Sequence, residues 1–188
     1  MTLKNLNDKI IITKKIEYDE IMTTFEPDGM NKKEQRYFHR NKIHDVQWYE
    51  AKIPNNIIKN VILSHHPRCQ LSFFPRMLTH LYNKNEMISK HGATVEETCN
   101  RLQKFKKYYE QKRLKCIKII KNYNTKNFRP IILTQIPINS RRQKKIRQKS
   151  NNLICYDGLH RLLSLYYPEK INFDYVKCFI AVSDENKR

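Results

Sequence analysis

The residues with the clearest chemical potential lie in the run Asp-Gly-Leu-His-Arg at positions 157–161. An apolar segment, residues 153–156, precedes this run, and a leucine-rich segment with helical spacing follows it, so we expect a strand, a turn and a helix. A helix N-terminus exposes unpaired N–H groups and a partial positive charge, and therefore accepts phosphate. Arg161 would grip the phosphate with two parallel hydrogen bonds, and His160 would donate to it near neutral pH.

Two further residues of the run would shape the turn. Asp157 stands where the N-cap of the helix is expected. Gly158 can take a positive φ and lets the backbone approach a ligand closely. Asp-Gly is also a common turn, and a basic residue after it can be merely solvated. Basic groups in a first helical turn oppose the helix dipole, however, so His160 and Arg161 favour an anionic partner.

The glycine content excludes two large classes of nucleotide-binding protein. The 188 residues include three glycines, Gly29, Gly92 and Gly158. Neither the phosphate-binding loop of P-loop enzymes nor the glycine fingerprint of dinucleotide folds can be written with them. If the chain binds phosphate, it uses a different kind of binding site.

A large excess of positive charge indicates anionic partners. The chain has 37 Lys and Arg against 18 Asp and Glu, a net charge of +19. Nucleic acid, nucleotide phosphates, anionic lipid and acidic glycans are the candidates. Residues 141–149 form the densest basic run, without an acid or an aromatic residue, and are either a solvated hairpin tip or an arm that contacts nucleic acid or another anionic surface. The candidate contacts in this run are Arg141, Arg142, Lys144, Lys145 and Arg147.

The cysteines and the apolar segments favour a cytoplasmic protein. The five cysteines are odd in number and show no C-x-x-C spacing, so neither a disulfide framework nor a cysteine-rich zinc module is expected. His65, His66 and Cys69 are close in sequence but do not make a convincing zinc site, because adjacent residues of an extended segment point to different faces. The N-terminus resembles no signal peptide, and no apolar run approaches a membrane span of about 20 residues.

The remaining pattern predicts alternating strands and helices of an α+β protein. We expect strands over residues 9–18, 46–53, 130–136, 153–156 and 175–182. Residues 57–63 are expected to form a helical turn. A long amphipathic helix is expected to begin after Thr94, which has capping-box spacing to Glu97, and to run to about residue 120. A shorter helix follows Gly158 and ends before Pro168.

The order of these segments, together with the Asp-Gly-Leu-His-Arg turn, resembles the ParB/sulfiredoxin superfamily over residues 94–182. A helix, a Pro-Ile-Ile-Leu strand, a Leu-Ile-Cys-Tyr strand, the turn, a leucine-rich helix and a closing strand follow one another as in that family. The resemblance implies a small mixed sheet packed with helices. It also implies a domain over residues 46–188 with an N-terminal extension, residues 1–45.

The resemblance implies a nucleotide site at the turn. Gly158, Leu159, His160 and Arg161 would bind the phosphates of ATP or ADP with Mg²⁺, and Arg68 would add to them. Asp157 would orient the turn or bind the metal ion, and Glu50 would be an acid near the acceptor hydroxyl.

The residues of the motif indicate which branches of the superfamily the chain resembles more. Leu159 stands where sulfiredoxin has its catalytic cysteine, and the Glu-Arg-Arg of partition proteins is absent. The motif is closer to the kinase and nuclease-like branches. The leading prediction is a nucleotide-dependent phosphotransferase acting on a small hydroxyl-bearing substrate. The alternatives are a ParB-like DNA-binding protein or nuclease, which the net charge favours, and a non-catalytic nucleotide-sensing module.

Overall fold

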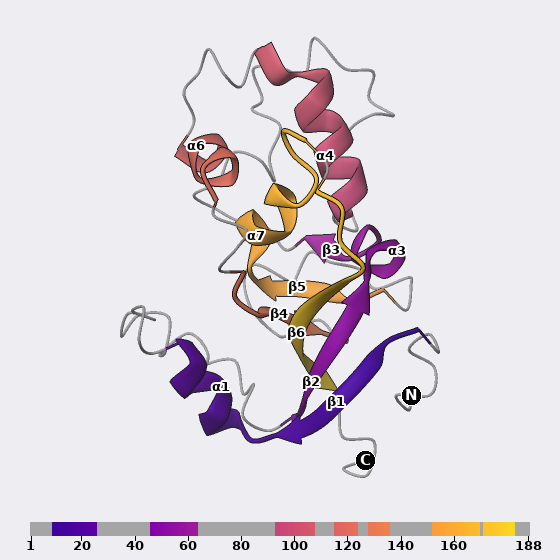
Figure 1. Cartoon of the computed structure of the whole chain (residues 1–188), viewed down its shortest axis with the longest axis vertical. Coiled ribbons are helices and arrows are strands. Elements are labelled where there is room, and N and C mark those ends of the chain that lie inside the picture. The colour runs from indigo at the N-terminus through magenta and orange to yellow at the C-terminus, as the bar shows by residue number, and fades with distance from the viewer. Residues whose placement is uncertain are drawn as a thin grey trace.

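The computed structural model describes residues 9–25, 46–63, 93–107, 115–123, 128–135, 152–169 and 171–182. Within them, the chain is an α+β protein with one six-stranded mixed sheet and five short helices (Figure 1). The strands are β1 (Ile11–Ile16), β2 (Gln47–Pro54), β3 (Ile62–Leu63), β4 (Ile131–Thr134), β5 (Ile154–Asp157) and β6 (Tyr175–Val182). The helices are α1 (Tyr18–Phe25), α3 (Asn55–Ile58), α4 (Val95–Lys104), α6 (Lys115–Lys121) and α7 (Leu159–Ser164).

The sheet brings together strands that are far apart in sequence. Its order is β1-β2-β6-β4-β5-β3. β2 pairs antiparallel with both β1 and β6, and β4 runs parallel to β6 but antiparallel to β5. The short β3 runs parallel to β5 at the other edge. Because side chains alternate between the two faces of each strand, the sheet has two distinct surfaces.

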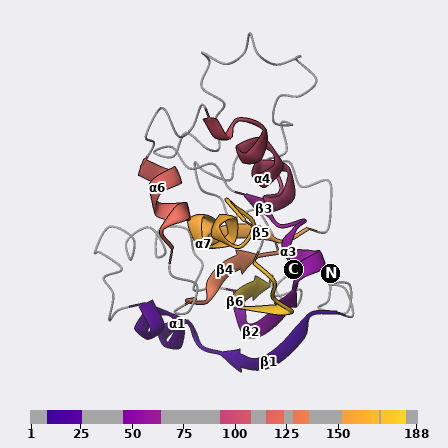
Figure 2. The same cartoon turned by 45° about the horizontal axis from the view of Figure 1, so that its top comes forward.

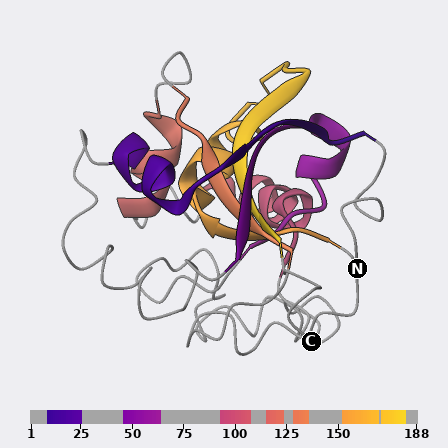
Figure 3. The same cartoon turned by 90° about the horizontal axis from the view of Figure 1, so that it is seen from below.

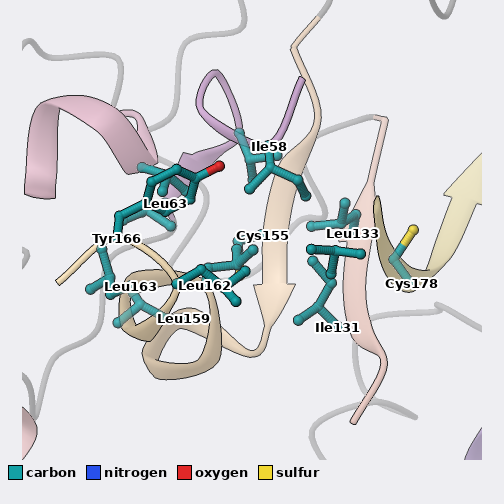
Figure 4. Packing of buried hydrophobic residues seen from close by; sticks show 14 of the residues in the cluster. Ile58, Leu63, Ile131, Leu133, Cys155, Leu159, Leu162, Leu163, Tyr166 and Cys178 are labelled. Atoms are coloured by element: carbon teal, nitrogen blue, oxygen red, sulfur yellow. The ribbon is translucent and has the colours of Figure 1, made fainter. Parts of the chain in front are cut away.

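Four helices cover one face of the sheet and form the main core. Buried side chains of α3, α4, α6 and α7 pack against those of the strands. Figure 4 shows the leucines of α7 against Cys155 on β5 and against Ile131 and Leu133 on β4. Figure 2 shows α7 between α6 and α4, and α7 contacts both of these helices. The turn before α7 is therefore held from several sides.

The second face of the sheet carries a smaller core beneath α1. Ile21 and Met22 of this helix pack with Trp48 on β2 and Phe179 on β6. In Figure 3, α1 and β1 lie alongside the rest of the sheet. Residues 1–45 were expected to be an N-terminal extension of the domain. Within this segment, β1 is an edge strand of the sheet and α1 covers part of its second face.

The long helix expected after Thr94 begins as predicted but is interrupted. The Glu97 amide donates to Thr94 Oγ1 at 3.2 Å, and the Thr94 amide donates to Glu97 Oε2 at 2.9 Å, so the capping box is confirmed. The α4 helix then ends at Lys104, with Phe105 outside helical geometry. A separate helix, α6, begins at Lys115. The prediction of one continuous helix to residue 120 was wrong, and no glycine or proline marks the interruption.

Candidate phosphate-binding turn

A left-handed glycine joins β5 to α7. Gly158 has φ 100° and ψ 17° and is the N-cap of α7. The predicted positive φ is confirmed, whereas Asp157 is the last residue of β5 and not the N-cap as expected. A Cβ on Gly158 would lie 2.6 Å from Ile131 Cγ2. Glycine is therefore required at this position both by the backbone conformation and by the contact with β4.

The side chain of Arg161 folds back over this glycine. Its Nη2 donates to Asp157 Oδ2 in an ion pair four residues apart. Its Nε and Nη2 each lie 3.0 Å from the position of a Cβ on Gly158. The side chain is 11% exposed, whereas that of Asp157 is 51% exposed. The guanidinium thus lies against the main chain of the turn, with a solvated carboxylate beside it.

His160 and Leu159 have different environments although they are neighbours. Burial lowers the pKa of His160, the nearby Asp157 carboxylate opposes this, and the Arg161 cation adds to the lowering. The imidazole is therefore neutral near pH 7 and can donate a hydrogen bond without carrying a charge. The Leu159 side chain is buried in the main core, so this residue can offer a phosphate only its main chain.

A thiol lies beneath the turn but is unsuited to catalysis. Cys155 Sγ donates to the Asp157 carbonyl oxygen at 3.5 Å. Burial raises the pKa of the Cys155 thiol, and the Asp157 carboxylate raises it further. A buried neutral thiol is a poor nucleophile, so Cys155 fills space under the turn.

Glu50 lies elsewhere on the sheet. Its carboxylate accepts a hydrogen bond from Thr13 Oγ1 at 3.2 Å and forms an ion pair with Lys177 Nζ at 3.2 Å. Glu50 is on β2, and β6 and β4 separate that strand from β5. Three strand intervals of about 4.8 Å put it roughly 14 Å from the Asp157 turn. The structure brings Asp157, His160 and Arg161 together but does not bring Glu50 to them.

Several predicted positions lie outside the described residues. These are Arg68 with its neighbours His65, His66 and Cys69, and the basic run with Arg141, Arg142, Lys144, Lys145 and Arg147. Within the described ranges, no group of three or more His, Cys, Asp and Glu side chains is arranged to hold a metal ion. Of the described residues of the turn, Asp157 has the exposed carboxylate that could ligate a metal ion.

Sequence reasoning did not find Ile131 as a part of the turn. This residue lies on β4, 27 positions before Gly158, and its methyl group occupies the space that a side chain at 158 would need. The Pro-Ile-Ile-Leu segment predicted a strand at β4. No local pattern, however, indicated which of its side chains would meet the glycine.

The fold and the turn define an α+β protein with a six-stranded mixed sheet and a strand–glycine–helix turn that carries a basic pair. The sequence matches the model of DUF6309, a family of unknown function, over residues 10–183, and the chain belongs to this family. A search of curated proteins and a search of solved structures each found no significant match. Among the helices that the structure describes, none has the length and apolar character needed to cross a membrane.

Proposed function

We propose that the chain is a nucleotide-dependent phosphotransferase of ParB/sulfiredoxin-like type, with ATP or ADP bound at the turn around Gly158. The observation that carries the proposal is the guanidinium of Arg161, which lies against a left-handed glycine at the start of a helix, next to His160. A guanidinium at the start of a helix, where the first amides have no partner within the helix, is a favourable environment for phosphate oxygens.

The Asp157 carboxylate occupies one side of this guanidinium in the free protein. A phosphate would share the guanidinium with Asp157 or displace the carboxylate from it, because both are anions that accept hydrogen bonds from its N–H groups. His160 would add a neutral donor on the adjacent position. Mg²⁺, when bound, would neutralise charge on the phosphates, and Asp157 has the solvated carboxylate to ligate it.

The transfer step requires one proton acceptor near the substrate. In the reaction proposed, the acceptor hydroxyl loses its proton to a carboxylate while its oxygen bonds to phosphorus, and the bond to the leaving nucleotide breaks. Among the residues that the structure describes, Asp157 is the acid at the turn. Glu50 is separated from it by two strands and is engaged by Lys177 and Thr13, so the proposal assigns the proton to Asp157.

A second function, a nucleotide-sensing module without chemistry, is favoured by a specific observation. Asp157 is the carboxylate at the turn, and it is already engaged in an ion pair with Arg161. In that case an incoming phosphate would displace the Asp157 carboxylate from Arg161, and Asp157 would not accept a proton. Both functions share the binding step and differ in what Asp157 does.

Calorimetric titration of the full chain with ATP, ADP, GTP and AMP, each with and without Mg²⁺, tests the binding step. We expect one nucleotide to bind and Arg161→Ala to lose about tenfold or more in affinity, since a charge-assisted bidentate contact is removed. Lys118→Ala is the matched control, because it removes one exposed positive charge on α6. If the wild type binds none of these nucleotides, or if both variants bind as the wild type does, the proposal is wrong.

Asp157→Asn separates the two functions. The amide keeps the shape of the side chain but can neither accept a proton nor bind Mg²⁺ strongly. For a phosphotransferase, nucleotide turnover measured with a panel of small alcohols and amino acids falls by about 100-fold or more, while nucleotide affinity measured without Mg²⁺ does not fall. For a sensing module, the wild type shows no turnover, and the variant binds nucleotide more tightly because a competing anion has been removed.

A further inference from the structure

Away from α1, the second face of the sheet carries an exposed set of side chains that the turn does not involve. We call this surface the open lysine face. It consists of Ile11 and Lys14 on β1, Glu50 and Lys52 on β2, and Tyr175 and Lys177 on β6. The register joins them, because Ile11 is opposite Lys52 and Lys52 is opposite Lys177. Residues directly opposite each other, and those two apart on one strand, share a face.

This face is open in the folded chain. Tyr175 is 49% exposed and Ile11 45% exposed, and the side chains of Lys14 and Lys177 are exposed by more than half. On the same strands, Trp48 and Phe179 are buried beneath α1. Figure 1 shows why: α1 follows the last residue of β1 and lies at that end of the strand, so it leaves the opposite end uncovered.

The lysines of this face repel one another. Lys52 and Lys177 are cross-strand neighbours, and like charges in this position destabilise a sheet. Glu50 offsets part of this through its ion pair with Lys177 at 3.2 Å, and Lys14 is paired with Glu20 at 2.8 Å. Within the described part of the chain, Lys52 has no ion-pair partner. A partner that supplied negative charge here would relieve this repulsion.

An aromatic ring stands next to these ammonium groups. Tyr175 is two residues before Lys177 on β6 and projects from the same face. It is the most exposed of the large hydrophobic side chains that the structure describes. About half of the surface of this residue is in water, although a buried position would gain free energy from apolar contact.

From this arrangement we propose that the open lysine face binds single-stranded nucleic acid. Lys52 and Lys177 contact backbone phosphates, and the ring of Tyr175 stacks on a base. Aromatic stacking next to a positive groove or face is how sequence-tolerant single-strand binding is achieved. A duplex fits this face less well, because its bases are already stacked on one another and are not available to the ring of Tyr175. The net charge of +19 would steer the strand to the protein.

Fluorescence anisotropy with labelled oligothymidine and oligouridine, titrated with the full chain over a series of salt concentrations, tests this proposal. For single strands, each phosphate contact contributes about 0.7 to the slope of log affinity against log salt. The double variant Lys52→Gln/Lys177→Gln should therefore reduce the slope by about 1.4. Tyr175→Leu, which keeps an apolar side chain of similar reach but removes the stacking ring, should weaken binding about tenfold.

Lys106→Gln/Lys118→Gln provides the matched control. It removes the same charge from exposed positions on the helical side of the sheet. This control should retain the wild-type salt slope. Equal losses in the two double variants would mean that general attraction, and not this face, binds the strand. Absence of binding at low salt, or tighter duplex binding that Tyr175→Leu does not change, would also overturn the proposal.

The test of oligonucleotide binding is independent of the nucleotide site proposed at the turn around Gly158. Nucleotide titration of Lys52→Gln/Lys177→Gln should match the wild type, because β4 separates β6 from β5, and both β6 and β4 separate β2 from β5. Arg161→Ala should in turn bind the oligonucleotides with the wild-type salt slope. Failure of one proposal can thus be told from failure of the other.

Discussion

Two separate features of the structure require glycine at position 158. Its φ of 100° disfavours any residue with a Cβ, and that Cβ would lie 2.6 Å from Ile131 Cγ2. We expect Gly158→Ala to lower the free energy of unfolding by about 2 kcal/mol or more, measured by urea denaturation. In an Ile131→Ala background the substitution should cost less, because the clash with Ile131 Cγ2 is gone, whereas the backbone strain and the close approach to Arg161 remain. An unchanged denaturation midpoint in Gly158→Ala would contradict this geometry.

His160 should make stability depend on pH. Burial lowers its pKa in the folded protein, whereas the unfolded chain has the ordinary value of about 6.5. As pH falls below about 6.5, the unfolded chain therefore binds a proton that the folded protein does not, and stability is lost until the folded pKa is reached. Above that window the contribution is fully present. Denaturation of the wild type and of His160→Gln between about pH 7 and pH 5 checks this, and parallel curves would refute it.

Residue types identified much of the turn, but not its contacts. The Asp-Gly-Leu-His-Arg run predicted Gly158 with a positive φ and a basic pair at the start of a helix, and both are present. The run did not reveal that Arg161 would pair with Asp157, because the Asp157 side chain was expected to cap the helix, whereas Gly158 is the N-cap. Glu50 was assigned to the site only because a phosphotransferase needs an acid near the acceptor hydroxyl. Its position depends on strand order, which local sequence does not encode.

At the scale of elements, the capping box of α4 is the strongest local signal. Thr94 and Glu97 exchange side-chain and main-chain hydrogen bonds at 3.2 and 2.9 Å. We expect Thr94→Ala to cost about 1 kcal/mol of unfolding free energy. Glu97→Ala should cost less in the Thr94→Ala background than alone, because the two bonds support one helical turn. Thermal or urea denaturation of this double-mutant cycle measures the coupling.

Glu96→Ala is the control for that cycle. Glu96 lies in the same first turn but makes a half-exposed ion pair with Lys59 at 3.5 Å. Pairs of this kind contribute little, so the loss should be under about 0.5 kcal/mol. A loss for Glu96→Ala as large as that for Thr94→Ala would show that charge at the helix start matters more than the capping bonds.

Two elements differed from the sequence prediction for the same physical reason. Residues 57–63 were expected to form a helical turn, and the segment splits into α3 and the two-residue β3. β3 exists because Ile62 and Leu63 pair with Ile154 and Cys155, which are about ninety residues away. Similarly, nothing in the sequence around Phe105 announces the end of α4. Whether such short elements form depends on tertiary packing, and the spacing of apolar residues along the sequence does not reveal that packing.

At the scale of the whole molecule, the sequence predicted an α+β protein but not the sheet order. Most strands were found by composition, including β4, β5 and β6, because each is a short apolar run between turn signals. The order β1-β2-β6-β4-β5-β3 depends on pairings between distant segments. The open lysine face depends on it too. Alternation of Tyr175, Val176 and Lys177 hints at an exposed face, but only the register puts Lys52 beside Lys177.

The place of β1 and α1 in the molecule can be tested with the one tryptophan of the chain. Trp48 is 2% exposed and lies in the second core with Ile21 of α1. If this core unfolds with the sheet, Trp48 fluorescence and far-UV circular dichroism should give one coincident urea transition. Ile21→Ala should lower the unfolding free energy by about 2–5 kcal/mol and move both midpoints together, because Ile21 is fully buried. A red shift of Trp48 fluorescence that precedes the loss of circular dichroism would mean that the N-terminal segment detaches by itself, and that it is an extension added to the domain after all.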